Sequence, residues 1–268
     1  MDPQVIRLYE ELGLNAHPAE HTQFVDGWVL RFAQGHTKRS NSIQMLYPSA
    51  LDPLVTIAEC ERRYAQQGLP TIVKVIQDRD DAIDALLEQR GYEKVEPTFV
   101  MSVPIDAVRL RGVEPRLDVR VSDHVDDEWF QEYWRLSRSG RPEDPTAARA
   151  ILDGVREPMA TVRLVLDQET VACGQVIFER GYAGLFNIVV SEGRRGEGYG
   201  RAACEEVIRR ATEHGAHTCY LQVSEGNHVA VGLYTHLGFQ PVYSYWYRVG
   251  PGPVSGATGV VTGSDGFG

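Results

Sequence analysis

Basic side chains are few in this chain of 268 residues. Its 27 Lys and Arg residues stand against 37 Asp and Glu residues, which gives a formal net charge of -10. Binding to a nucleic-acid backbone requires a basic surface that neutralises phosphates, so this balance argues against a nucleic-acid partner. An acidic surface instead raises the local concentration of cations, amines included. The charge therefore favours a small cationic partner without identifying one.

Cysteines and long apolar runs are also few. Four cysteines are present, without a C-x-x-C pair or metal-ligand spacing: Cys60, Cys173, Cys204 and Cys219. This pattern predicts free thiols in a reducing compartment and no bound metal. No apolar run reaches the roughly 18 residues of a membrane-spanning helix, and no signal peptide is recognisable. We therefore expect a soluble, cytoplasmic protein without a membrane partner.

The most informative stretch runs from Asn187 to Gly200. A β-branched run there meets a turn rich in glycine and arginine, and a helical pattern follows. Glycine tolerates unusual dihedral angles and lets a ligand approach the backbone. Free N–H groups at the start of a helix bind anions, and Arg195 adds a positive charge suited to phosphate. The sequence thus predicts a phosphate-binding turn at a strand-to-helix junction.

Several kinds of site could use such a turn. A P-loop would end in Gly-Lys-Ser/Thr, but Gly200 is followed by Arg201 and Ala202, which excludes that motif. The dinucleotide fingerprint G-x-G-x-x-A does fit Gly198 to Ala203. It is a short pattern that should open an alternating βαβ fold. A purely structural glycine turn with a solvated arginine is also open.

Arg195-x-x-Gly198-x-Gly200, preceded by an apolar strand, resembles motif A of the GNAT superfamily of N-acetyltransferases. The resemblance covers residues 116–248 and extends to Asn227 and Tyr234, which are separated by six residues. In the family, motif A holds the pyrophosphate of acetyl-CoA, and the Asn and Tyr lie near its pantetheine arm. The implied acetyl-CoA site consists of Ile188, Val189, Val190, Arg195, Gly196, Glu197, Gly198, Tyr199, Gly200, Arg201, Asn227 and Tyr234.

The resemblance also implies how the site would work. The strand Ile188–Val190 would bind the pantetheine amides as an added strand does. A backbone N–H of Val189 or Val190 would stabilise the oxyanion, and Tyr234 would protonate the departing thiolate. The base that takes the amine proton stays open between water and four carboxylates: Asp123, Glu128, Glu179 and Glu225.

We expect an enzyme that transfers an acetyl group directly from acetyl-CoA to an amine of a small molecule or amino-acid-like acceptor, without a metal. The alternative is a non-catalytic acyl-CoA-binding sensor, and a homodimer is a further possibility. Acceptor recognition is open between an aromatic helical stretch, a pattern that more usually belongs to a core, and a polar segment, which is more usually a solvated turn. Their members are Trp129, Phe130, Tyr133 and Trp134 in the first, and Thr37, Lys38, Arg39 and Asn41 in the second.

The chain also repeats itself at a constant offset. Thr71–Gln77 is similar to Thr218–Ser224, and Leu86–Tyr92 is similar to Leu233–Phe239, both pairs 147 residues apart. Each block reads as strand, helix, glycine-aromatic pair and strand. A constant offset argues for two copies of one fold, although short blocks can also match by coincidence.

The first copy lacks the phosphate-binding motif, because Pro48 and Leu51 stand where the second copy has Arg195 and Gly198. We predict an α/β (α+β) protein of two tandem GNAT-like domains, each a mixed, mostly antiparallel sheet flanked by helices. The expected division is a degenerate domain over 1–104, a linker over 105–115, a catalytic domain over 116–248 and a glycine-rich tail over 249–268.

Overall fold

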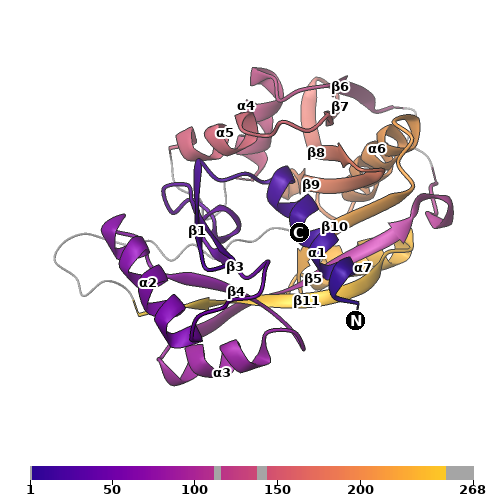
Figure 1. The fold of residues 1–268 in the computed structure, drawn as a ribbon. Coiled ribbons are helices and arrows are strands. Elements are labelled where there is room, and N and C mark those ends of the chain that lie inside the picture. The colour runs from indigo at the N-terminus through magenta and orange to yellow at the C-terminus, as the bar shows by residue number, and fades with distance from the viewer. Residues whose placement is uncertain (1, 112–115, 138–143, 252–268) are drawn as a thin grey trace. The chain divides into compact units, whose positions relative to one another are not determined.

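The computed structural model describes residues 2–111, 116–137 and 144–251 (Figure 1). Contacts divide the chain into two compact units. Unit 1 contains the described residues of Met1–Thr98, Thr146–Val155 and Tyr243–Gly263, and unit 2 those of Phe99–Pro145 and Arg156–Val242.

Unit 1 is built on a sheet with the strand order β1-β2-β3-β4-β11. Only β3 and β4 pair in parallel, and the other neighbours are antiparallel. The strands are β1 (His21–Val25), β2 (Trp28–Phe32), β3 (Ile43–Gln44), β4 (Ile72–Ile76) and β11 (Gln240–Val249). The helices are α1 (Pro3–Ala16), α2 (Pro53–Gln66), α3 (Asp81–Gln89) and α5 (Thr146–Asp153), with the short turn η1 (Lys38–Ser40).

The two faces of the unit 1 sheet differ in polarity. Val73 and Val75 of β4 point into an apolar core that includes Tyr64 of α2 and Leu87 of α3. Lys74 lies between these two valines and therefore points to the opposite face. There its Nζ lies 2.7 and 2.8 Å from the carboxylate oxygens of Glu10 in α1. The second face is thus a buried polar layer covered by α1.

Unit 2 contains an antiparallel meander, in line with the mostly antiparallel sheet that the sequence predicts. Strands β6 to β9 pair antiparallel in sequence order, and β10 joins β9 in parallel. The strands are β6 (Asp118–Ser122), β7 (Met159–Leu166), β8 (Glu169–Glu179), β9 (Tyr182–Val190) and β10 (Thr218–Ser224). The helices are α4 (Asp127–Leu136), α6 (Tyr199–Glu213) and α7 (His228–Leu237), with the short turn η3 (Glu192–Arg194).

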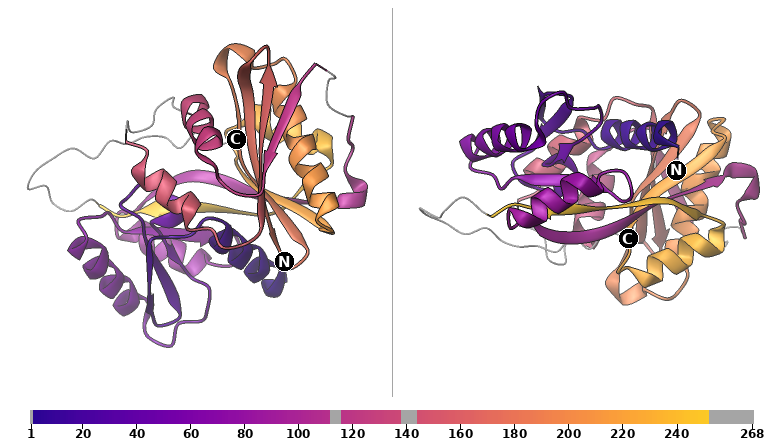
Figure 2. Two further views of the ribbon diagram at one scale, coloured as in Figure 1. Left: turned by 90° about the horizontal axis from the view of Figure 1, so that it is seen from above. Right: turned by 60° about the horizontal axis from the view of Figure 1, so that its bottom comes forward.

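Helices cover both faces of the unit 2 sheet, with α4 and α6 on opposite sides of the strands (Figure 2). The apolar stripe of α6, which includes Ala203, Val207 and Ala211, is fully buried in the core. On the other face, Trp129 of α4 is 1% exposed and its indole N–H donates to the Val162 carbonyl at 3.0 Å. The mixed sheet flanked by helices confirms the predicted fold class.

The repeat is visible in the elements themselves. Helix α3 begins at Asp81 and α7 at His228, and strand β5 (Glu93–Pro104) begins 147 residues before β11. The last strand of each copy contributes to a different unit from the rest of that copy: most of β11, from the second copy, belongs to unit 1, and the second half of β5, from the first copy, belongs to unit 2. In unit 1, β11 pairs antiparallel with β4, matching Tyr245 to Ile76. Strand β5, whose residues 99–104 belong to unit 2, neighbours β10.

The domain boundaries expected from the sequence are those of the two repeats, and they remain predictions. The described part of the expected linker 105–115 includes the turn η2 (Ile105–Ala107) and is hydrogen-bonded within unit 2, where the Ile105 N–H donates to the His217 carbonyl at 3.0 Å. Residues 112–115 lie outside the described residues, as does the expected tail beyond residue 251. Within the described ranges, no helix combines the length and apolar character needed to cross a bilayer.

Candidate functional site

Strands β9 and β10 form a fork. They pair in parallel from Tyr182 and Thr218 only as far as Gly184 and Tyr220. Both strands nevertheless continue, β9 to Val190 and β10 to Ser224. Beyond the last pair the two facing backbone edges are therefore available to a different extended partner.

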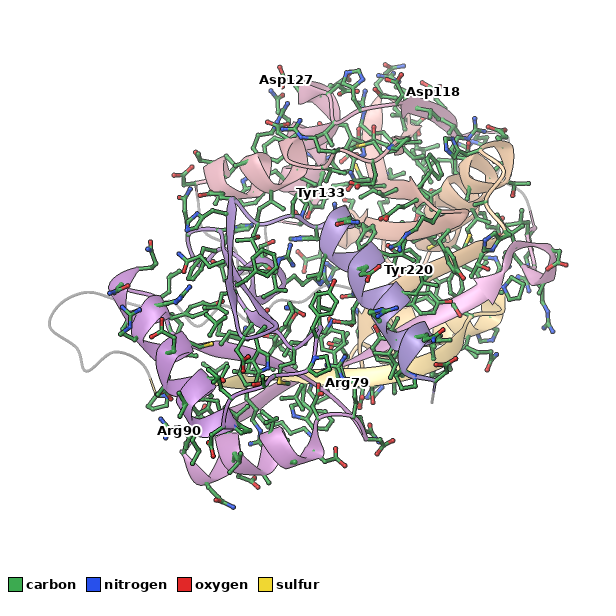
Figure 3. The ribbon with its side chains drawn as sticks, in the orientation of Figure 1. Arg79, Arg90, Asp118, Asp127, Tyr133 and Tyr220 are labelled. Carbon is green, nitrogen blue, oxygen red and sulfur yellow. The ribbon has the colours of Figure 1, made fainter. Side chains whose placement is uncertain are left out.

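Aromatic rings fill the base of the fork. The rings of Phe186 and Tyr220 meet edge to face, with centroids 6.0 Å apart at 85°. Gly184 lies between them, and a Cβ there would stand 2.5 Å from the Phe186 ring and 2.7 Å from the Tyr220 ring. Only glycine therefore fits at the last paired position of β9. Figure 3 labels Tyr220 on β10.

A β-bulge changes the direction of β9 just beyond this point. Cys173 of β8 pairs with Val189 and Gln175 pairs with Phe186, so that Asn187 and Ile188 together oppose Gly174. Asn187 has a φ of 54°, in the left-handed region that Asn tolerates better than most residues. A bulge bends the strand and increases its twist, which turns the end of β9 away from β10.

The predicted phosphate-binding turn follows β9 directly. Gly196 and Gly198 have φ values of 83° and 93°, conformations that strain any residue with a Cβ. Around Gly193, Gly196 and Gly198, no atom stands within 4 Å of the place a Cβ would take, so a ligand could approach the backbone. Gly198 is also the N-cap of α6 and supplies no side-chain cap. The first N–H groups of α6 are thus suited to an anion.

The arginines at the turn have different environments. Arg195 is exposed, and none of the ion pairs found among the described residues involves it. Arg194 lies 3.5 Å from the carboxylate of Glu197. The Arg201 guanidinium lies 2.6 Å from buried Glu205 and also donates to a backbone carbonyl. Arg195 is therefore the side chain best placed for phosphate, and the guanidinium of Arg201 already has structural partners.

Helix α7 brings the other two predicted residues beside the fork. The Asn227 side chain caps this helix by accepting from the Ala230 N–H at 3.1 Å. Tyr234 is 4% exposed and its ring meets Phe239 edge to face at 5.9 Å. Leu233 stands 3.7 Å from the Cβ position of Gly200, so α7 lies against the start of α6. The end of β9, the glycine-rich turn and α7 therefore lie around one site in unit 2.

The four candidate bases do not lie together at the fork. Glu179 pairs with Tyr182, at the opposite end of β9 from Val190. Asp123 is almost fully exposed, and its hydrogen bond with His124 lowers its pKa, which weakens it as a base. Glu128 is paired with Arg163. Glu225 is half-buried, just beyond the end of β10. These positions favour water over a fixed carboxylate as the base that takes the amine proton.

The two candidate acceptor-recognition segments prove to have structural contacts. Asn41 is 2% exposed, and its side chain accepts from the Ala33 and Gly35 N–H groups at 2.7 and 2.8 Å. Lys38 forms an ion pair with Glu96. In α4, Trp129, Phe130 and Tyr133 are buried, as expected for core aromatics. Within the described residues, no group of three or more His, Cys, Asp or Glu side chains could hold a metal ion.

Comparisons with known proteins agree with this geometry. The family model described as "Probable histone acetyltransferase Rv0428c C-terminal" matches residues 4–248. The "Uncharacterized N-acetyltransferase YobR" of Bacillus subtilis strain 168 is 31% identical over 247 residues, which are 91% of this chain and 98% of that protein. The chain belongs to the GNAT superfamily of N-acetyltransferases.

Solved structures share the fold of this GNAT protein. A GCN5-related N-acetyltransferase from Kribbella flavida has a TM-score of 0.72 at 15% identity, over 94% of this chain and 96% of that chain. A tandem GNAT protein from the clavulanic acid biosynthesis pathway has a TM-score of 0.68 at 13% identity, over 92% and 88%. The tandem GNAT arrangement predicted from the internal repeat is thereby supported.

The first GNAT copy holds an anion of its own at the matching turn. Its residues Ala50 and Leu51 stand 147 positions before Glu197 and Gly198. The N–H groups of Ala50 and Leu51 donate to the carboxylate of Asp26 at 3.0 and 2.8 Å, and the Ser49 hydroxyl donates to it as well. These hydrogen bonds lower the pKa of Asp26, with that from Ser49 as the largest cause. A carboxylate of the chain thus occupies this turn.

We expect Asp26→Asn to lower the melting temperature at neutral pH and to lose this effect in acid. Because the folded pKa of Asp26 is depressed, its stabilisation is present above the unfolded pKa and is lost as pH falls through the folded pKa. Thermal unfolding of both proteins between about pH 7 and pH 2 measures this. Asp52→Asn is the matched control, because Asn caps a helix as well as Asp. A difference independent of pH would contradict this role of Asp26.

Proposed function

We propose that unit 2 binds acetyl-CoA at the fork and the turn, and transfers the acetyl group directly to an amine of a small molecule or amino-acid-like acceptor. The observation that carries this proposal is the continuity of the site. Strand β9, which parts from β10 after Gly184, is followed by the turn with two glycines of positive φ and then by the start of α6, which has no side-chain cap. An anion and an extended chain could therefore bind side by side.

Different groups would hold different parts of the substrate. Arg195 and the backbone from Gly196 to Arg201 would bind the pyrophosphate, with Glu197 and Tyr199 contributing main-chain N–H groups. The edge of β9 from Ile188 to Val190 would pair with the pantetheine amides. Asn227 and Tyr234 would face the pantetheine arm from α7. Acetyl-CoA supplies the thioester whose carbonyl carbon accepts the amine.

The residues of the fork would then assist transfer. The N–H of Val189 or Val190 would stabilise the negative charge that develops on the carbonyl oxygen. As the C–N bond forms and the C–S bond breaks, the Tyr234 hydroxyl would give its proton to the sulfur. The proton lost by the amine would pass to water, and the Tyr234 phenolate would regain a proton from water. This sequence of events leaves an amide and free CoA, without an intermediate bonded to the protein.

Two similarities point to acceptors other than a small amine. The [Ribosomal protein bS18]-alanine N-acetyltransferase of Escherichia coli K12 is 38% identical over 68 residues, which are 25% of this chain and 45% of that protein. The description of the family model names histone acetylation. A protein α-amine and a lysine side chain are therefore the second acceptor class. The chemistry at the thioester would be the same for each.

An acceptor panel tests the proposal. Acetyl-CoA is mixed with free amines, amino acids, peptides with a free N-terminus and peptides with an internal lysine, and both released thiol and product mass are measured. Release of CoA that depends on one of these amines supports an enzyme with that acceptor class. Binding of acetyl-CoA without thiol release from any mixture would favour the sensor alternative. A failure of the protein to bind acetyl-CoA would contradict the proposal.

We expect Tyr234→Phe to reduce turnover by roughly 100-fold, the lower range for loss of a general acid, while the Kd for acetyl-CoA changes by less than about twofold. The ring and its contact with Phe239 are kept, and only the hydroxyl is removed. Steady-state kinetics and calorimetry separate the two quantities. Tyr92→Phe in unit 1 is the control, since it also removes a buried hydroxyl. Full turnover by Tyr234→Phe would exclude the acid role.

A further inference from the structure

The bulge in β9 is held by side chains from two other elements. The Tyr133 hydroxyl of α4 donates to Asn187 Oδ1 at 2.9 Å, and Asn187 Nδ2 donates to Gln175 Oε1 of β8 at 2.7 Å. Both the oxygen and the nitrogen of the Asn187 side-chain amide are therefore hydrogen-bonded. A non-glycine residue with positive φ is strained unless its surroundings compensate for the strain. These two hydrogen bonds provide that compensation.

The partners of Asn187 are themselves fixed in place. Tyr133 is 4% exposed and stacks on Trp129, with ring centroids 5.0 Å apart at 11°. Trp129 is anchored by its hydrogen bond to the Val162 carbonyl. Gln175 is 1% exposed. Tyr133 is labelled in Figure 3. The hydroxyl that reaches the bulge thus comes from a rigid aromatic pair.

The opposite face of the bulge depends on close packing. A Cβ at Gly174 would stand 2.9 Å from Ile188 Cδ1 and 3.0 Å from Val207 Cγ1 of α6. The absence of a side chain at Gly174 therefore lets Ile188, the second bulged residue, pack against α6 in the core. Hydrogen bonds on the α4 face and this contact on the α6 face together determine the path of β9 beyond the fork.

We propose that Tyr133 is a positioning residue for the acyl donor, because its hydroxyl holds Asn187 and thereby sets the edge of β9 against which the pantetheine arm lies. This inference rests on the proposed function of the same site. Tyr133 need not touch the substrate. Its effect should be confined to ligands that occupy the fork, because the phosphate-binding turn begins only after Val190.

Tyr133→Phe tests this inference, since it removes the hydroxyl and keeps the ring that stacks on Trp129. Loss of one neutral hydrogen bond predicts that the Kd for acetyl-CoA rises by about 3- to 10-fold. ADP carries a pyrophosphate without a pantetheine arm, so its affinity should not change. Calorimetry with both ligands on the full chain measures the contrast. Equal losses for acetyl-CoA and ADP would show a general structural effect and overturn the inference.

Two further variants sharpen this test. Tyr64→Phe removes a buried hydroxyl from unit 1, where it bonds the Arg31 carbonyl, and should leave the Kd for acetyl-CoA unchanged. Asn187→Ala should weaken acetyl-CoA binding, and adding Tyr133→Phe to it should cost little more, because both act through one hydrogen bond. Fully additive losses of affinity from the two substitutions would show that Tyr133 does not act through Asn187.

The outcomes also separate this inference from the proposed function. If the wild-type chain does not bind acetyl-CoA, both are wrong. If the wild type binds it and Tyr133→Phe binds it equally well, the site is retained and only the positioning role of Tyr133 is excluded.

Discussion

The Arg195→Ala/Gly198→Val double variant is expected to bind acetyl-CoA roughly 100-fold more weakly than the wild type, or not measurably. Arg195 is exposed and forms none of the ion pairs found among the described residues, and a hydrogen bond to a charged phosphate contributes more than one between neutral groups. Gly198 has a φ of 93°, which a β-branched residue strongly disfavours. The valine would also cover the first N–H groups of α6. Calorimetry with acetyl-CoA measures the loss.

Gly193→Ala is the matched control for this turn. Gly193 is exposed, does not have a positive φ, and has no atom within 4 Å of its Cβ position. Its substitution should leave the affinity for acetyl-CoA within about twofold, because a methyl group in open space changes little. An unchanged affinity of the double variant, with a normal melting temperature, would show that the turn does not hold the pyrophosphate.

Glu10→Ala is expected to destabilise the protein by about 3–5 kcal/mol, which is the usual cost of leaving a buried charge without its partner. The side chains of Glu10 and Lys74 are 2% and 7% exposed, and their ion pair lies within unit 1. Tyr243 donates a hydrogen bond to the same carboxylate at 2.6 Å. Burial, together with the charge of Glu10, raises the pKa of Tyr243, so this phenol stays protonated and keeps its donor role. Chemical denaturation measures the loss.

The neighbouring Glu11→Ala is the control, because its ion pair with Arg7 spans 3.8 Å and is partly exposed to solvent, with side chains 31% and 53% exposed. We expect it to cost less than about 1 kcal/mol. The double variant Glu10→Leu/Lys74→Met should be more stable than Glu10→Ala, because it removes both charges at once. A small effect of Glu10→Ala, similar to that of Glu11→Ala, would show that this pair does not anchor α1.

Local patterns account for what could be predicted from the sequence. The glycine-rich turn, the helical pattern that follows it and the antiparallel sheet of unit 2 each depend on residues close together in the chain. The constant offset likewise places the start of α3 and α7 correctly. Propensity and periodicity describe these features well because they are determined locally.

Long-range pairing accounts for what could not be predicted. Residues 240–249 form the expected closing strand, but nothing local indicates that it pairs with β4 of the first copy. The bulge also depends on distant partners, since Asn187 needs both Gln175 and Tyr133. The sequence does hold one signal, because a glycine inside a strand often marks a bulge and Gly174 stands in the strand before Asn187. From the sequence alone, Tyr133 is expected only as an acceptor contact or a core aromatic.

A crystal structure of the full chain with acetyl-CoA most directly tests whether the fork and the turn form one acyl-donor site. We predict the pyrophosphate at the N–H groups of Gly196 to Arg201, and the pantetheine arm between β9 and β10, beyond Gly184 and Tyr220. Electron density for the coenzyme at any other place on the protein, with the two strands still parted and empty, would contradict this account.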